Sequence, residues 1–249
     1  MKTFAAVVLA AGKGTRINAK RINKVMYPLA GKPMISYTVH LLKKVGIKRI
    51  VIVVGFLKES IINYLGSNYI YAYQKRTLGT AHAVKTALPK ISSEVKNILV
   101  MHADDSAFLP PKVIKGLIKK HLKEKAQLTF LTVEMEKPNI ARVLRNSKGK
   151  IIGVVELQNM KSDQEKINEI NCGCYCFSKS FLEKFLPKIR KNSLTGEYYL
   201  PKLIELGLKA NLRVKAFKMR KEDYFHSINT KDQLNKAKLK MKIKLIKNG

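Results

Sequence analysis

A glycine-rich stretch near the N-terminus has the residue types and spacing best suited to chemistry. It reads Leu9-Ala-Ala-Gly-Lys-Gly-Thr-Arg16, and its two glycines can turn the backbone sharply and bring N–H groups close to a ligand. Backbone donors beside several cations indicate a site for a polyanion. The cations fall within twelve positions and are Lys13, Arg16, Lys20, Arg21 and Lys24.

Two well-known phosphate loops do not fit this stretch. A Walker A loop ends in Gly-Lys-Ser/Thr, but here Gly12-Lys13 is followed by Gly14, and Gly31-Lys32 is followed by Pro33. A dinucleotide fingerprint requires glycine or alanine at position 17, where this chain has isoleucine. Two interpretations remain: a different anion-binding loop, or a basic surface loop that joins a strand to a helix.

An acidic pair is the second candidate for chemistry. An apolar run over residues 98–101 is followed by His102-Ala-Asp104-Asp105. Ligands of open α/β sheets bind beyond the carboxyl ends of the strands, so we expect the pair and the glycine loop to lie at the same edge. A carboxylate could hold Mg²⁺ there while backbone N–H groups, Lys and Arg hold phosphate. The alternative is a helix-capping pair that precedes Ser106.

The elements that must position these groups alternate along the first half of the chain. The apolar run of residues 4–10 predicts a buried strand that leads into the glycine loop. The alternation of strand and helix predicts a parallel sheet with helices on both faces. Further strands are expected at residues 50–54, 69–73, 98–101 and 128–133, and helices at 34–45, 57–65, 81–88 and 110–124.

The second half of the chain is richer in strands. Residues 141–144 and 150–156 flank a glycine turn and predict a hairpin, and residues 171–177 predict another strand. Three helices are expected: residues 179–186 capped by Ser178, residues 199–208, and a lysine-rich helix capped by Thr230 that reaches about residue 246.

The cysteines and the N-terminus predict a cytoplasmic protein. Cys172, Cys174 and Cys176 share one face of the expected strand and lack the spacing of a zinc site, so we expect buried free thiols in a reducing compartment. The N-terminal apolar run is followed at once by cations, which argues against a signal peptide. The longest other apolar run, residues 50–57, is far shorter than the ~20 residues of a membrane span.

The chain is strongly basic. Lys and Arg total 49 against 17 Asp and Glu, which gives a formal net charge of +32 and suggests a nucleic-acid-binding protein as an alternative of another class. Only nine of these residues are arginine, the lysines are spread along the chain, and tyrosines are not interleaved with them. We therefore interpret most of the charge as solvated surface and expect no nucleic-acid partner.

Five motifs, in order, make the chain resemble one enzyme family, that of the bacterial N-acetylglucosamine-1-phosphate uridylyltransferases. The resemblance is to their nucleotidyltransferase domain and covers about residues 4–235. The motifs are the glycine stretch with Lys24-Val25, Pro28-Leu-Ala-Gly-Lys-Pro33, Leu78-Gly-Thr-Ala-His-Ala83, Glu169-Ile-Asn171 and Gly196-Glu-Tyr-Tyr199.

The resemblance implies both a fold and a reaction. The fold would be α/β and Rossmann-like, with a mostly parallel central sheet and a smaller β-rich sugar-binding lobe. The reaction would be Mg²⁺-dependent attack of a sugar-1-phosphate on UTP, giving pyrophosphate and a UDP-sugar for cell-envelope precursors. Residues 1–135 would form the nucleotide-binding half, residues 136–230 the sugar-binding half, and residues 231–249 a basic C-terminal helix. No hexapeptide repeats follow, so the acetyltransferase activity of bifunctional members is not expected.

The resemblance also implies a role for each residue that matches the family's motifs. Arg16 and Lys24 would be catalytic, because they neutralise the leaving and reacting phosphates. The metal would be held by Asp104 and by Asn229, which lies in Ser227-Ile-Asn-Thr230. The nucleotide would be bound by Ala11, Gly12, Gly14, Thr15, Gln74, Gly79 and Thr80, and the sugar by Ala141, Glu156, Asn171 and Tyr199.

Some of these residues also fit simpler interpretations, and some positions depart from the family. Glu156 could be a surface acid, Asn171 a turn residue and Tyr199 a core aromatic. Near the loop, Asn23 stands where the family has proline, the spacing from arginine to lysine is one residue longer, and Asp105 could share the metal. On the sugar side, Ala141 replaces a glycine, and Cys172 and Pro201 replace threonines. An alternative is therefore a glucose-1-phosphate uridylyl- or thymidylyltransferase.

Overall fold

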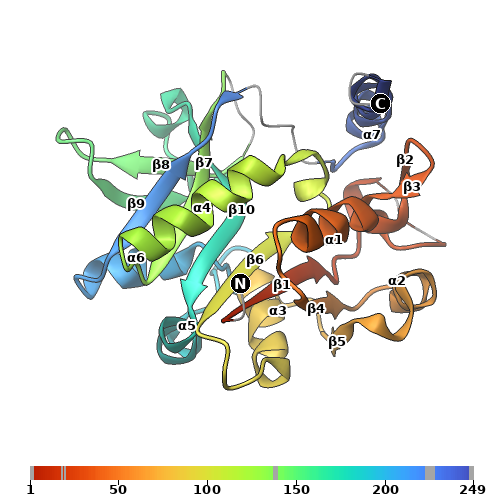
Figure 1. The fold of residues 1–249 in the computed structure, drawn as a ribbon. Coiled ribbons are helices and arrows are strands. Elements are labelled where there is room, and N and C mark those ends of the chain that lie inside the picture. The colour runs from red at the N-terminus through yellow and green to blue at the C-terminus, as the bar shows by residue number, and fades with distance from the viewer. Residues whose placement is uncertain (1–2, 18, 20, 137–139, 222–227, 247–249) are drawn as a thin grey trace.

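The chain forms three layers, with helices on both faces of one twisted sheet (Figure 1). The structure is a computed structural model that describes residues 3–17, 19, 21–136, 140–221 and 228–246. The strands of the main sheet are β1 (Phe4–Ala10), β4 (Arg49–Val54), β5 (Ile70–Tyr73), β6 (Asn97–His102), β7 (Leu128–Glu134), β8 (Arg142–Arg145), β9 (Ile151–Val155), β10 (Glu169–Ser178) and β11 (Val214–Lys218).

The main sheet is mostly parallel, as predicted. Seven strands follow the order β11-β7-β10-β6-β1-β4-β5, and only β10 runs antiparallel to its neighbours in that path. A separate small sheet pairs β2 (Pro28–Leu29) with β3 (Lys32–Pro33). The helices are α1 (Met34–Lys44), α2 (Lys58–Leu65), α3 (Thr80–Ala87), α4 (Pro111–Lys123), α5 (Lys179–Phe185), α6 (Lys202–Lys209) and α7 (Lys231–Ile246).

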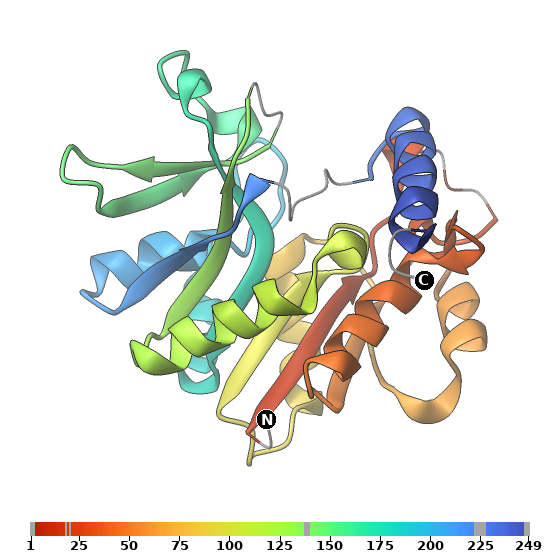
Figure 2. The same cartoon turned by 45° about the horizontal axis from the view of Figure 1, so that its top comes forward.

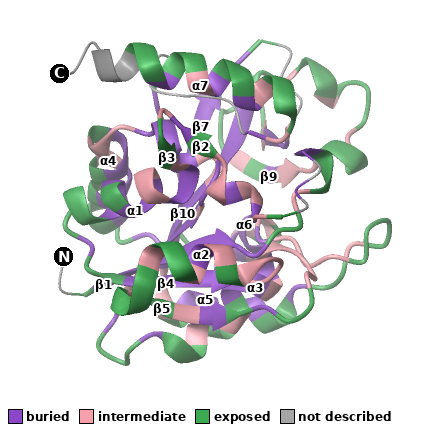
Figure 3. Ribbon diagram, turned by 90° about the vertical axis from the view of Figure 1, so that its right-hand side faces the viewer, coloured by how far each residue is buried: buried purple, intermediate pink, exposed green. Residues whose placement is uncertain are grey.

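The two faces of the sheet have separate cores because successive side chains of a strand point to opposite sides. In β1, Phe4, Ala6 and Val8 pack into one core with residues of α1, α2 and α4. The alternate residues Val7 and Leu9 pack into a second core with α3, α5 and α6. Figure 3 shows the strands as the buried centre of the molecule, so the predicted layers of helices over a buried sheet are confirmed.

The predicted hairpin is formed by β8 and β9, and it stands apart from α7 in Figure 2. The side chain of Asn146 closes the turn by accepting hydrogen bonds from the N–H groups of Lys148 (3.1 Å) and Lys150 (2.9 Å). Arg145 ties the hairpin to β10, because its guanidinium donates to both carboxylate oxygens of Glu169 at 2.6 and 2.8 Å. The hairpin extends the main sheet beside β10 and lies within residues 136–230, which were expected to form a smaller β-rich half.

The C-terminal helix α7 packs beside the glycine loop. Leu234, Ala237 and Met241 of α7 lie in one apolar cluster with Ile17. Thr230 caps the helix as predicted, since its hydroxyl accepts a hydrogen bond from the N–H of Gln233 at 3.2 Å. The docking of α7 therefore fixes the position of the residues just before it.

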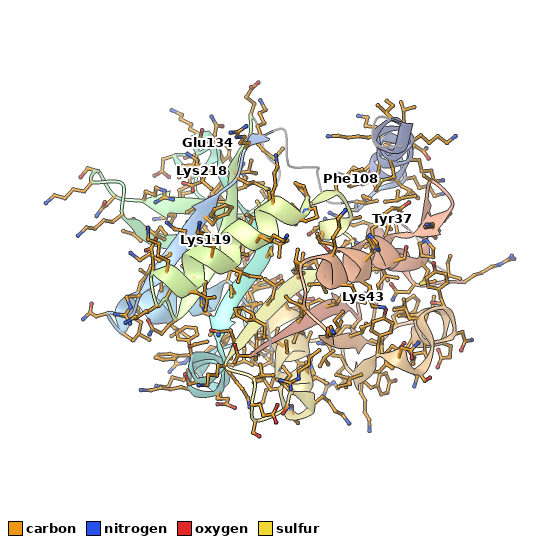
Figure 4. The ribbon with its side chains drawn as sticks, in the orientation of Figure 1. Tyr37, Lys43, Phe108, Lys119, Glu134 and Lys218 are labelled. Carbon is orange, nitrogen blue, oxygen red and sulfur yellow. The ribbon has the colours of Figure 1, made fainter. Side chains whose placement is uncertain are left out.

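Two local predictions were wrong, and an edge strand was missed. The helix expected from residue 199 begins at Lys202, because the chain before it bonds to the segment around residues 78–81. Ser178 occupies the cap position of α5, but its hydroxyl makes no capping hydrogen bond. The edge strand β11 was not predicted; it pairs with β7, and Lys218 on β11 forms an ion pair with Glu134 on β7 (2.5 Å; Figure 4).

The three cysteines are buried and free, as predicted. They lie in the same core with α1 and α4, and burial raises the pKa of Cys174 far above its usual value. Such thiols stay protonated and pack as small apolar groups. Among the residues that the structure describes, no helix is both long and apolar enough to cross a lipid bilayer.

A buried histidine makes the stability of this fold dependent on pH. Burial lowers the pKa of His121 to about 4, and the ring bonds to Thr129 (3.0 Å) and Asn97 (3.2 Å). The folded-state pKa is below the unfolded one, so this contribution is complete above pH ~6.5 and is lost as pH falls toward 4. Between pH 7 and pH 4.5, the free energy of unfolding of the parent should fall by about 2 kcal/mol more than that of His121→Gln. Urea unfolding at the two pH values measures this difference. His40, exposed on α1, supplies the control variant His40→Gln; identical pH dependence in the His121 variant and the parent would contradict the expectation.

Candidate active site

The glycine loop and the acidic pair meet at the carboxyl edge of the sheet. Leu9 of β1 pairs with His102 of β6, and the N–H of Ala103 donates to the carbonyl of Leu9 at 3.1 Å. The loop after β1 and the pair after β6 are therefore neighbours, as the parallel arrangement predicted.

Two adjoining cavities at this edge contain the predicted site residues. The loop cavity has a volume of about 550 Å³, and the hairpin cavity has about 400 Å³. Arg16, Lys24, Thr80, His102 and Asp104 line both cavities. The loop cavity is also lined by Ala11, Gly12, Gly14, Thr15, Gln74 and Gly79, and the hairpin cavity by Ala141, Glu156, Asn171, Tyr199, Asp105 and Asn229.

A charged network occupies the wall between the cavities. The ammonium of Lys24 forms an ion pair with the carboxylate of Asp104 and donates to Asn229 Oδ1 at 3.2 Å. Arg16 Nη2 donates to the same oxygen at 3.0 Å. Burial alone would raise the pKa of Asp104, but the positive charge of Lys24 and the neighbouring His102 outweigh it and keep this pKa below its usual value. Asp104 is therefore ionised at neutral pH.

Asp105 lies in a different environment. Burial and the negative charge of Asp104 raise the pKa of Asp105 to about 8. Its side chain makes no capping hydrogen bond to the turn that follows, so the helix-capping interpretation is wrong for this residue. Its Oδ1 is buried and has no hydrogen-bond partner among the described residues.

His102 was not predicted as a site residue, although it lines both cavities. Burial lowers its pKa, so the imidazole is neutral at pH 7. Its ring lies beside Gly173 of β10, which has φ +68° and no side chain. The sequence did contain a signal for this residue, because His102 ends the strand that the acidic pair follows.

Asn23 holds the glycine loop in place. The residue is 1% exposed, and its side-chain oxygen accepts a hydrogen bond from the N–H of Val25 at 3.1 Å. Its amide nitrogen donates to the carbonyl oxygens of Ala10 (3.2 Å), Gly12 (3.3 Å) and Phe56 (2.6 Å). The backbone of Asn23 has φ −61° and ψ 148°, a conformation that proline also adopts. The departure from the family's proline therefore keeps the backbone conformation and adds side-chain bonds.

Loss of these bonds should destabilise the loop. In Asn23→Ala, three carbonyl groups near the loop lose a donor, so we expect a loss of about 2 kcal/mol in the free energy of unfolding. Chemical denaturation measures it directly. Asn68→Ala, at an exposed position, is the matched control and should change stability by less than ~0.5 kcal/mol. Equal stability of the two variants would show that the network around Asn23 contributes nothing.

The segments around Gly79 and Tyr198 form one wall of the loop cavity. The N–H of Tyr198 donates to the carbonyl of Leu78 (2.8 Å), and the N–H of Ala81 donates to the carbonyl of Tyr198 (2.9 Å). Gly79 has φ +94°, and a Cβ atom there would lie 2.6 Å from the Tyr198 oxygen, so only glycine fits. Gln74 contacts Gly79 through its amide nitrogen (3.1 Å). Two motifs that are far apart in the sequence are thus in direct contact.

The residues of the hairpin cavity are held by their neighbours. Asn171 is buried and its amide nitrogen donates to the hydroxyl of Tyr175 at 2.6 Å, so it is a strand residue and not a turn residue. Tyr199 is half-buried and its hydroxyl donates to Thr195 at 2.9 Å, which contradicts a core aromatic in a helix. Burial raises the pKa of Glu156, which follows β9 and is not a fully solvated acid.

The other predicted cations are placed less centrally. Lys13 is exposed at the rim of the loop cavity, and Arg21 is exposed and lines neither cavity. Lys20, and Ser227 of the proposed metal motif, lie outside the described residues.

Comparisons with known proteins agree with this geometry. Residues 6–171 match the model of the MobA-like NTP transferase domain. The chain belongs to this family. The predicted nucleotidyltransferase domain is confirmed.

Relatives and solved structures extend the similarity beyond residue 171. The chain is 37% identical to the bifunctional protein GlmU of Symbiobacterium thermophilum over 97% of its length, and 34% identical to that of Geobacillus thermodenitrificans over 98%. It spans about half the length of these relatives, 52% and 54%.

Its fold is similar to that of a protein described as a glucose-1-phosphate thymidylyltransferase from Bacillus anthracis (TM-score 0.79, 20% identity, 96% and 95% of the two chains). It is also similar to the inositol-1-phosphate CTP transferase from T. maritima (TM-score 0.73, 20% identity, 96% of each chain).

Proposed function

We propose that this chain transfers a uridylyl group from UTP to N-acetylglucosamine-1-phosphate, giving a UDP-sugar and pyrophosphate. The observation that carries the proposal is the shared wall between the two cavities. A nucleotide in the loop cavity and a sugar phosphate in the hairpin cavity would bring their phosphates together at Arg16, Lys24 and Asp104. The similarity to GlmU proteins supports the same assignment.

The proposed reaction needs no protein nucleophile. A phosphate oxygen of the sugar-1-phosphate attacks the α-phosphorus of UTP, and the bond to the bridging oxygen breaks so that pyrophosphate leaves with the electron pair. Catalysis then depends on positioning and on neutralising charge. The loop at Gly14 and Thr15, with Arg16, would hold the leaving phosphates, and Lys24 would move from Asp104 to the reacting phosphates.

The base would be bound at the other end of the loop cavity. Gln74 uses its amide nitrogen to contact Gly79 and His82, and its carbonyl oxygen has no hydrogen-bond partner among the described residues. That oxygen can accept the imide N–H of uracil. The backbone of Ala11 and Gly12 and the Gly79–Thr80 segment would complete this pocket.

Asp104 and Asn229 fit a divalent cation such as Mg²⁺. Both present side-chain oxygens, the ligands that Mg²⁺ prefers, and the ammonium of Lys24 already contacts both of them. When bound, the ion would screen the negative charge of the phosphates. The sugar itself would contact Glu156, Asn171 and Tyr199 and would lie against Ala141.

The test is pyrophosphate release across a panel of nucleoside triphosphates and sugar-1-phosphates. We expect the highest kcat/KM with UTP and N-acetylglucosamine-1-phosphate. Preference for glucose-1-phosphate or dTTP would replace the substrate assignment, and no release with any pair would reject transferase activity. Binding to nucleic acid with a log–log salt slope of about −0.9 per phosphate contacted would then favour the alternative class.

A further inference from the structure

His102, Asp104 and Asp105 form a compact donor cluster in the hairpin cavity. One potential ligand atom from each lies within 4.8 Å of the others. An octahedral ion with ligands at about 2.1 Å places neighbouring donors about 3 Å apart and opposite donors about 4.2 Å apart. The 4.8 Å limit on the three donor atoms is close to this spacing, so the cluster is geometrically compatible with one shared ion.

The surroundings leave two of these donors without competing partners. Asp105 Oδ1 is buried and accepts no hydrogen bond from the described part of the chain. The histidine ring faces Gly173, where a Cβ atom would lie 3.0 Å from the imidazole Cδ2 and 3.7 Å from Asp105 Oδ2. Gly173 thus leaves open the space beside both donors. A buried carboxylate oxygen with no donor is costly unless a proton or a cation satisfies it.

We propose that His102 and Asp105 join Asp104 in binding one first-row transition-metal ion, such as Mn²⁺, in preference to Mg²⁺. Mg²⁺ favours an all-oxygen shell and loses its water reluctantly, whereas an imidazole nitrogen stabilises Mn²⁺ and later ions of the row. The sequence-based prediction for this metal, Asp104 with Asn229, supplies oxygen donors alone. The claim that this ion serves the transferase rests on the proposed function.

The experiment measures metal binding to the whole chain without substrates. The chain is stripped with a chelator and titrated with MnCl₂, and the free Mn²⁺ signal is followed by electron paramagnetic resonance. Pulsed measurements on the bound ion should show coupling to an imidazole nitrogen. Absence of that nitrogen coupling in the parent protein would overturn the proposal, and this readout needs no variant.

Two variants separate the ligands. His102→Gln should weaken Mn²⁺ binding at least ~10-fold, abolish the nitrogen coupling and change Mg²⁺ affinity much less. Asp105→Asn should weaken both ions, because it removes a negative charge and leaves the imidazole in place. The control His40→Gln, at an exposed position of α1, should bind as the parent does. Unchanged Mn²⁺ affinity in a folded His102→Gln variant would also overturn the proposal.

Failure of the metal site and failure of the transferase remain distinguishable. Nitrogen-coupled Mn²⁺ in a chain that releases no pyrophosphate would uphold the site and reject the proposed function. Pyrophosphate release with Mg²⁺, together with Mn²⁺ that shows no nitrogen coupling, would uphold the transferase and reject the role of His102.

Discussion

Replacing Asp104 by asparagine should lower kcat/KM for pyrophosphate release by at least ~10²-fold. The variant removes the ionised carboxylate that pairs with Lys24 at the wall between the cavities. A divalent cation would lose a charged ligand, and the ammonium of Lys24 would lose the carboxylate that positions it before it moves to the reacting phosphates. Asparagine and aspartate have nearly the same shape, so the loss of charge is the main difference between the variant and the parent. Steady-state kinetics with saturating metal measure the effect.

Asp163→Asn provides the matched control, because Asp163 is an exposed acid that lines neither cavity. It should keep the activity of the parent. Thermal unfolding of both variants shows whether the Asp104 variant is folded. A folded Asp104→Asn enzyme with more than half of the parent kcat/KM would remove Asp104 from the reacting centre.

Arg16→Ala is expected to have a loss of the same order, at least ~10²-fold in kcat/KM. Arg16 lines both cavities and contacts Asn229 from the glycine loop, so its charge lies where pyrophosphate would leave. Arg16→Lys should recover only part of the activity, because an ammonium keeps the charge but not the planar fork that binds two phosphate oxygens. The comparison of the two variants separates charge from geometry.

The control for Arg16 lies in the same loop region. Arg21 is exposed and lines neither cavity, so Arg21→Ala should reduce kcat/KM by less than ~3-fold at physiological salt, the scale of losing a screened surface charge. Equal losses in the two alanine variants would mean that general positive charge, and not the position of Arg16, attracts the substrates. The position of the guanidinium would then carry no catalytic role.

Most strands and helices could be predicted because their signals are local. The apolar run of residues 4–10 is long enough to specify β1 without knowledge of its neighbours. Once the sheet is parallel, its geometry places the loop after β1 beside the end of β6, so the meeting of Arg16 and Asp104 also followed from the sequence. The resemblance to a family then supplied the residues from distant segments.

The features that were not predicted depend on contacts between distant segments. Val214 to Lys218 form an edge strand only because β7 presents a free edge to them. Residue 199 was expected to be helical, but Leu200 donates its N–H to the hydroxyl of Thr80, and the helix begins only at Lys202. Asn23 holds the glycine loop through three carbonyl groups that only the fold brings together. The place of His102 in the site likewise depends on a glycine in β10.

The contact between Arg16 and Asn229 joins positions 213 residues apart. It exists because the helix that follows Asn229 docks onto the apolar cluster that also contains Ile17, beside Arg16 in the loop. During synthesis, the glycine loop and the strands up to β10 are therefore made well before Asn229. A nascent chain that stops short of this docking step would have both cavities in outline but an incomplete charged wall, so the competence of the site is coupled to completion of the polypeptide through residue 229.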